Sequence, residues 1–118
     1  MALVAGGTGY VGGRLIRVLR EHGYPVRCLA RRPKFLEERV GRHVDVVKGD
    51  VLQKETLAPA LHGVDTAFYL VHSMGDDRSF EELERAGAEN FGAVAKETGV
   101  RRIIYLGGLG GGPDLSPH

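Results

Sequence analysis

The chain has 118 residues, 42% of them hydrophobic and 26% charged, with a formal net charge of +1 at pH 7. These values fit one globular domain over residues 1–118, and the small charge gives no reason to expect nucleic acid or an anionic membrane as a partner. A single cysteine excludes a disulfide framework and favours a reducing, cytoplasmic location, and no apolar run approaches the roughly 20 residues that span a membrane.

The chain begins with an apolar run, residues 2–5, that leads into closely spaced glycines and then at once into a helical pattern. The order of strand, glycine turn and helix is the setting of a dinucleotide-binding fingerprint. Two overlapping interpretations fit: Gly7-x-Gly9-x-x-Gly12 and Gly6-x-x-Gly9-x-x-Gly12. In either one the glycines permit a tight turn, a close approach of pyrophosphate to the backbone and close packing of helix on strand.

The free N–H groups at the start of this helix would bind the phosphates. We therefore assign to the cofactor pyrophosphate the backbone of Gly6, Gly7, Thr8, Gly9, Tyr10, Val11 and Gly12. The Thr8 hydroxyl could donate to a phosphate or cap the helix. The simpler alternative for the whole stretch is a tight strand–helix turn that binds nothing.

The rest of the chain alternates between strand and helix patterns. Strands are predicted at residues 2–5, 25–30, 44–48, 66–71 and 102–106, and helices at about 10–23, 34–40, 54–61 and 79–98. The strand at 66–71 is apolar enough to be buried on both faces. The inner side of the last helix is predicted to comprise Leu83, Ala86, Gly87, Asn90, Phe91, Val94 and Ala95.

This alternation implies right-handed βαβ crossovers and a parallel sheet with helices on both faces. We expect a Rossmann-type, doubly wound α/β fold with strand order 3-2-1-4-5, and the glycine turn at its topological switch point. The last strand is apolar, so as a sheet edge it would invite pairing. We expect further C-terminal chain or another subunit, as in a homo-oligomer, to cover it.

Two arginines, Arg31 and Arg32, follow the second strand, where a NAD-selective site places an acid on the ribose 2′-OH. That acid is absent, and two guanidinium groups could pair with a 2′-phosphate through charge-assisted hydrogen bonds. The pair favours NADP(H), keeps NAD(H) as an alternative and makes FAD a poorer fit. The other interpretation is a solvated basic loop, since paired arginines are common on surfaces.

Six segments carry a resemblance to a known family: residues 6–12, 30–32, 49–51, 68–72, 88–90 and 102–106. In this order they resemble the atypical or extended short-chain dehydrogenases/reductases, which include NmrA-like and NAD(P)H-binding, epimerase-like proteins. The resemblance implies a NAD(P)-binding Rossmann domain serving an oxidoreductase or epimerase-like reaction on a small molecule. Family members are usually much longer, so we expect this chain to be the N-terminal part of a larger protein.

The resemblance also implies roles for residues at the ends of the third and fourth strands. In the family an acid at the position of Asp50 bonds the adenine amino group, and the next side chain, here Val51, packs on the ring. Asp50 could equally cap the turn that follows it. Leu70, Val71 and His72 should border the cofactor ribose. His72 could act as an acid–base group because histidine titrates near neutral pH, or it could simply be solvated.

Catalytic family members commonly carry a serine after the fifth strand and a Tyr-x-x-x-Lys pair further on. Here Gly107 and Gly108 follow that strand, and the chain contains no Tyr-x-x-x-Lys. Hydride chemistry needs a positioned proton donor as well as a cofactor, so the catalytic residues stay unknown. The alternative function is a non-catalytic NAD(P)(H)-binding sensor or assembly protein of the NmrA-like kind. The five histidines lack a metal-binding spacing, so no metal is expected.

Overall fold

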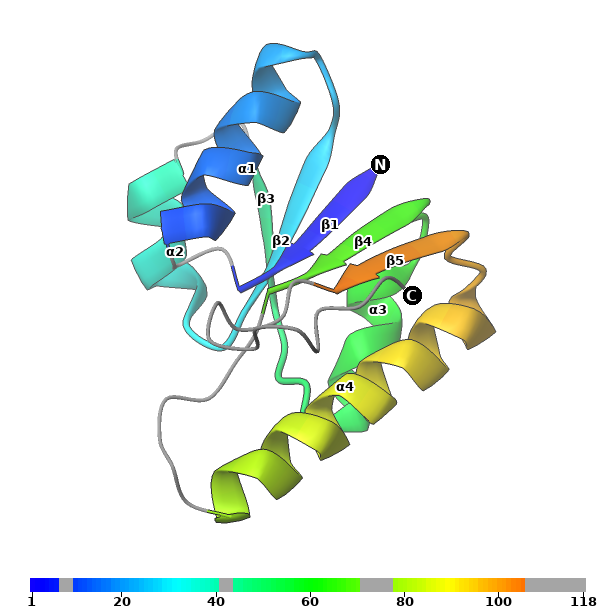
Figure 1. Cartoon of the computed structure of the whole chain (residues 1–118). Coiled ribbons are helices and arrows are strands. Elements are labelled where there is room, and N and C mark those ends of the chain that lie inside the picture. The colour runs from blue at the N-terminus through cyan, green and yellow to red at the C-terminus, as the bar shows by residue number, and fades with distance from the viewer. Residues whose placement is uncertain (7–9, 41–43, 71–77, 106–118) are drawn as a thin grey trace, which may run out of the picture.

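Five parallel strands form a single sheet in the order β3-β2-β1-β4-β5, the order predicted from the sequence (Figure 1). The computed structural model describes residues 1–6, 10–40, 44–70 and 78–105. The strands are β1 (Ala2–Ala5), β2 (Val26–Ala30), β3 (Asp45–Lys48), β4 (Thr66–Tyr69) and β5 (Arg102–Tyr105). Because all pairings are parallel, every strand ends at the same edge of the sheet.

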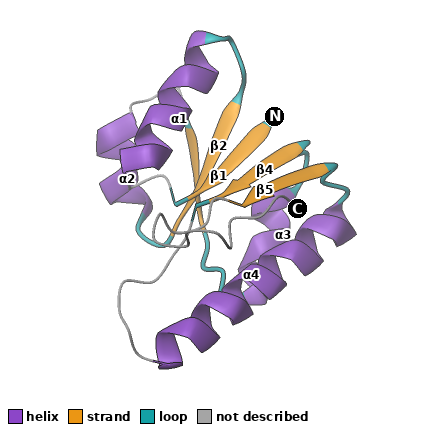
Figure 2. Cartoon of the chain, viewed as in Figure 1, coloured by secondary structure: helices purple, strands orange, loops and turns teal. Residues whose placement is uncertain are grey.

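Helices cover both faces of the sheet (Figure 2). The helices are α1 (Tyr10–Glu21), α2 (Pro33–Val40), α3 (Leu57–Leu61, preceded by the 3₁₀ turn η1, Lys54–Thr56) and α4 (Arg78–Thr98). α1 and α2 lie on one face, and α3 and α4 on the other. α2 starts one residue earlier than predicted, at Pro33, whose fixed φ and missing N–H suit the first position of a helix. The doubly wound α/β prediction is confirmed.

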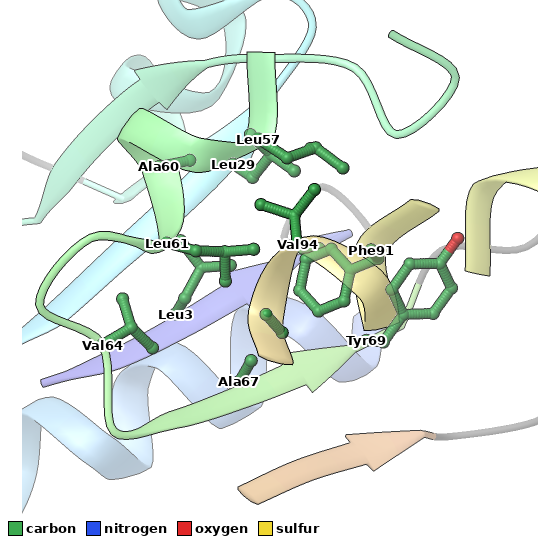
Figure 3. Close-up of a cluster of buried hydrophobic side chains, with 12 residues drawn as sticks. Leu3, Leu29, Leu57, Ala60, Leu61, Val64, Ala67, Tyr69, Phe91 and Val94 are labelled. Carbon is green, nitrogen blue, oxygen red and sulfur yellow. The ribbon is translucent and has the colours of Figure 1, made fainter. Parts of the chain in front are cut away.

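Alternate strand residues supply two hydrophobic cores. Leu3, Ala67 and Tyr69 point toward α3 and α4, where they meet Phe91 and Leu61 (Figure 3). On the opposite face the core comprises Val4, Ile16, Val26, Cys28, Ala30, Leu36, Val44 and Leu70. All four residues of β1 are buried, as befits the central strand of a parallel sheet.

β4 is less buried than its sequence suggests. Ala67 and Tyr69 are buried, but Thr66 and Phe68 on the other face are only half-buried. α1 and α2 pack against β1, β2 and β3, so they leave that face of β4 partly uncovered. The prediction of burial on both faces is therefore wrong for half of this strand.

The buried side of α4 is shorter than the sequence predicts. Gly87, Phe91, Val94 and Ala95 are buried, whereas Leu83 is 45% exposed and Ala86 is exposed too. A helix of 21 residues is about 31 Å long, but a strand of four residues extends only about 13 Å. The first turns of α4 therefore project past the sheet (Figure 1), which explains the exposure.

β5 forms one edge of the described sheet and pairs there with β4. Ile103 and Ile104 are half-buried, and Tyr105 is 51% exposed. Apolar side chains on an open edge are typical of a strand that pairs or packs further. Coverage of this edge by further chain or by another subunit stays a prediction.

Candidate functional site

The residues selected from the sequence gather where the strands end. Gly6 follows β1, Arg31 and Arg32 follow β2, Asp50 and Val51 follow β3, and Leu70 follows β4. β1 lies between β2 and β4, so the chain reverses its winding direction at Gly6. Ligands of open α/β sheets bind at this switch point, outside the carboxyl ends of the strands. Five of the selected residues lie outside the described part of the chain: Gly7, Thr8, Gly9, Val71 and His72.

Gly6 occupies a position that no other residue would fit without strain. Its φ is +99°, in the region that side chains rarely adopt. A Cβ atom on Gly6 would lie 2.9 Å from the carbonyl carbon of Leu70 and 3.1 Å from its oxygen. The Leu70 N–H in turn donates to the Ala5 carbonyl at 2.8 Å. The ends of β1 and β4 therefore meet backbone to backbone at this point.

The predicted helix start after the glycines is confirmed. α1 begins at Tyr10, with Gly12 buried in its first turn and the neighbouring Val11 48% exposed. The first turn contains no acidic residue, so its N–H groups and the positive end of the helix dipole are not offset locally. Such a helix start, directly after the glycine-rich stretch of the sequence, suits a phosphate group.

Arg31 and Arg32 lie side by side in the chain, directly before α2, and both are exposed. Within the described residues, neither guanidinium lies within ion-pair distance of a carboxylate. The first turn of α2 also lacks an acid. Two fixed positive charges thus stand beside the positive end of a helix dipole, an arrangement that favours an anion.

Asp50 organises the turn that follows β3. Its Oδ1 accepts the Leu52 N–H at 2.9 Å, so the turn-capping role considered from the sequence is observed. Its own N–H donates to the Thr56 hydroxyl at 2.9 Å, and that hydroxyl lies 3.0 Å from the Asp50 carbonyl and 2.7 Å from the Gln53 carbonyl. Among the described residues, Oδ2 accepts no hydrogen bond, which leaves one carboxylate oxygen for another donor. No pattern in the sequence pointed to the Thr56 contribution.

Tyr69 and Tyr105 are the last residues of β4 and β5, so both lie at this edge of the sheet. They are register partners on β4 and β5, with ring centroids 5.5 Å apart. Burial, with smaller effects from Tyr105 and Glu84, raises the pKa of Tyr69 to about 12, and burial also raises the pKa of Tyr105. Both hydroxyls are neutral at pH 7, and Tyr69 packs in the core. Neither replaces the tyrosine of a Tyr-x-x-x-Lys pair, which needs an accessible, acidified hydroxyl.

Two further site types are absent from the described part of the chain. There is no cluster of three or more His, Cys, Asp or Glu side chains that could hold a metal ion. None of the helices there is both long enough and apolar enough to cross a bilayer.

A family model described as NAD(P)H-binding matches residues 6–117. The chain is 29% identical to 3 beta-hydroxysteroid dehydrogenase/Delta 5→4-isomerase of Mycobacterium tuberculosis, covering 98% of this chain and 36% of the relative. It is 32% identical to NAD(P)H azoreductase of Xenophilus azovorans, covering 97% and 37%. The chain therefore spans about a third of the length of these curated relatives.

The chain is also similar to solved structures of proteins that contain a nicotinamide dinucleotide. The triphenylmethane reductase of a Citrobacter species, complexed with NADP(H), matches with a TM-score of 0.78 and 26% identity, over 91% of this chain and 37% of that one. A short-chain dehydrogenase/reductase superfamily protein from Agrobacterium tumefaciens, with bound NAD, matches with a TM-score of 0.72 and 28% identity, over 89% and 31%. Similar structures thus contain both nicotinamide dinucleotides.

Proposed function

Because this chain belongs to the NAD(P)H-binding family, we propose that the carboxyl edge of its sheet binds NADP(H) in preference to NAD(H). The observation that carries the preference is the pair Arg31 and Arg32, exposed and directly in front of α2. A 2′-phosphate there would meet two guanidinium groups and a helix N-terminus. The first turn of α2 contains no acidic residue.

The remaining residues fit the other parts of a dinucleotide. The backbone of Gly6, Gly7, Thr8, Gly9, Tyr10, Val11 and Gly12 binds the pyrophosphate. Asp50 Oδ2, which accepts no hydrogen bond from the described residues, accepts from the adenine amino group, and the half-buried Val51 side chain packs against the ring. Leu70, Val71 and His72 border the ribose. The close approach of Gly6 to Leu70 supports this assignment of residues to the dinucleotide. A Cβ atom on Gly6 would fill the space between the ends of β1 and β4, where the dinucleotide is proposed to bind.

For the whole protein we propose an oxidoreductase or epimerase-like reaction on a small molecule. When bound, the dinucleotide supplies the hydride chemistry, and the protein orients it and excludes water. The similarity to a steroid dehydrogenase, an azoreductase and a triphenylmethane reductase supports this class. The second candidate function is a non-catalytic NADP(H)-binding sensor or assembly protein, because Gly107 and Gly108 stand where catalytic members of the resembled family commonly carry a serine.

Titration of the protein with NADPH and NADH tests the cofactor preference. The chain lacks tryptophan, so the fluorescence of the reduced nicotinamide can be followed without indole background. We expect wild type to bind NADPH at least tenfold more tightly than NADH. Arg31→Ala and Arg32→Ala should each weaken NADPH binding by about tenfold or more, the effect of one charge-assisted hydrogen bond, and leave NADH binding unchanged.

Arg102→Ala is the matched control, because Arg102 is an exposed arginine at the opposite edge of the sheet, where β5 begins. It should change neither affinity. A wild type that binds NADPH and NADH equally tightly would overturn the preference for NADP(H), and an unchanged ratio of the two affinities in Arg31→Ala and Arg32→Ala would overturn the role of the two arginines. Oxidation of NADPH by the full-length chain with a panel of quinones and carbonyls then separates an enzyme from a sensor, since only an enzyme consumes the cofactor.

A further inference from the structure

One side-chain hydrogen bond connects the long helix α4 to the turn after β3. The Asn90 amide nitrogen, Nδ2, donates to the Val51 carbonyl at 2.9 Å, across 39 positions of sequence. A peptide carbonyl can only accept, so the amide of Asn90 must present its NH₂ group and not its oxygen. Asn90 is half-buried, on the same side of α4 as Val94, Phe91 and Gly87.

Gly87, about one turn before Asn90, lets the helix approach this turn. A Cβ atom on Gly87 would lie 2.8 Å from Val51 Cγ2 and 3.0 Å from the Tyr69 hydroxyl oxygen. The contact with Val51 is shorter than real Cβ atoms make in folded proteins, so with any side chain here the Val51 side chain or α4 would have to shift. A glycine within a helix costs about 1 kcal/mol relative to alanine, and the close contact with Val51 is what it provides here.

The other end of the turn is held by Thr56, whose hydroxyl bonds the N–H of Asp50. Asp50 is thus fixed from the η1 side, while Val51 is fixed from the α4 side by Asn90 and Gly87. The two residues that the proposed function assigns to the adenine therefore have their backbone set before any ligand arrives. Ordering a turn in advance removes an entropic cost from binding.

We propose that Asn90 is a positioning residue for the adenine end of the dinucleotide site. It touches no part of the cofactor and acts through the Val51 carbonyl, which fixes the direction of the Val51 side chain and of the Asp50 carboxylate. This inference rests on the proposed function, because it needs the base to bind at Asp50 and Val51. Asn90 therefore influences one half of the dinucleotide and not the other.

The test compares two halves of the cofactor by calorimetry on the full-length chain. Adenosine 2′,5′-bisphosphate probes the adenine end, and reduced nicotinamide mononucleotide probes the other end. Asn90→Leu keeps the size of the side chain and removes the donor. We expect it to weaken binding of adenosine 2′,5′-bisphosphate about fivefold, the effect of one lost hydrogen bond, and to leave binding of the mononucleotide within twofold of wild type.

Glu89→Leu is the control, since Glu89 neighbours Asn90 on α4 but is exposed. It should leave both affinities unchanged. Gly87→Ala is the second variant: it displaces Val51 by steric contact and should produce the same selective loss, which decides the matter if Asn90→Leu does not fold. A purely structural role would weaken both halves together or neither, and either result overturns the inference. If wild type itself fails to bind adenosine 2′,5′-bisphosphate, the proposed function is wrong. If wild type binds it and the variants show no selective loss, only the positioning role of Asn90 is wrong.

Discussion

Arg27 and Asp45 are register partners on β2 and β3, and the Arg27 Nε donates to Asp45 Oδ2 at 3.0 Å. The same guanidinium donates through Nη1 to the carbonyls of Ala60 and His62, both at 2.8 Å. These carbonyls lie at the end of α3, where a helix leaves acceptors unsatisfied and favours a cation. One arginine thus joins two strands to the end of a helix.

Replacing Arg27 should therefore destabilise the domain more than replacing its acidic partner. The Arg27 side chain is 17% exposed and that of Asp45 is 57% exposed. Arg27→Met leaves the Ala60 and His62 carbonyls without their donor, and we expect the free energy of unfolding to fall by about 2 kcal/mol. Asp45→Asn should cost less than about 1 kcal/mol, the usual value of a solvated ion pair. Urea unfolding measures both, and equal losses would contradict this account.

Much of the fold was predictable because hydrophobic periodicity and glycine placement are local signals. The strand order followed from the alternation of strands and helices together with a glycine turn after β1. Periodicity identified the face of α4 that contains Phe91, Val94 and Ala95, but it cannot reveal how far a sheet extends beneath a helix. For that reason Leu83 was placed inside, and it is exposed.

The site was predictable in position but not in its internal bonding. Residues at strand ends, such as Gly6 and Asp50, could be selected because parallel strands bring their ends together. The bonds from Thr56 to Asp50 depend on the exact path of a turn, which no spacing rule specifies. Gly87 did carry a readable signal, since an isolated glycine within a helical pattern often marks a close contact.

The ionisation of Tyr69 should make the protein less stable at high pH. Its ring lies 4.9 Å from Phe91 and 5.5 Å from Tyr105, centroid to centroid, and burial raises its pKa from 10.0 to about 12. The unfolded chain loses this proton near pH 10, while the folded protein keeps it until about pH 12. The stability that the protein gains from keeping the Tyr69 hydroxyl protonated is therefore fully present below pH 10. It is lost as the pH rises from 10 to about 12.

Tyr69→Phe checks this expectation, because it removes the titrating group and keeps the ring. Ultraviolet absorbance of tyrosinate should show the last titrating tyrosine of wild type missing in the variant. The free energy of unfolding of the variant should also fall less steeply between pH 10 and pH 12. An unchanged absorbance titration would show that Tyr69 is not the group that ionises late.

The thiol of Cys28 should be inert in the folded protein. The side chain is fully buried in β2, and burial, helped by the Asp45 carboxylate, raises the pKa of the thiol to about 12. Only the thiolate reacts readily with alkylating or disulfide reagents. We expect labelling near neutral pH to follow the population of unfolded protein and to increase with urea.

The fully unfolded chain is the natural control for this labelling, because Cys28 is its single cysteine and should react with one equivalent. Rapid labelling of the native protein, at the rate seen in urea, would mean that β2 opens locally without global unfolding.

Alanine substitutions at two glycines with positive φ separate backbone strain from close contact. Gly23 has a φ of +76°, and a Cβ atom there would meet nothing within 4 Å, so Gly23→Ala carries only the strain and should cost about 1 kcal/mol of stability. Gly6, with φ +99°, adds the contact with the Leu70 backbone, which cannot rotate away, so Gly6→Ala should cost about 2–4 kcal/mol. Urea unfolding gives both values.

The same two variants decide what the glycine stretch does. Gly6→Ala moves the ends of β1 and β4 apart, so it should weaken NADPH binding by at least tenfold, while Gly23→Ala, at the far end of α1, should leave binding unchanged. If Gly6→Ala loses stability but keeps its affinity for NADPH, the stretch serves only as a tight turn between strand and helix. If both stability and affinity fall, the turn and the binding site are the same structure, because the close approach of Gly6 to Leu70 shapes both.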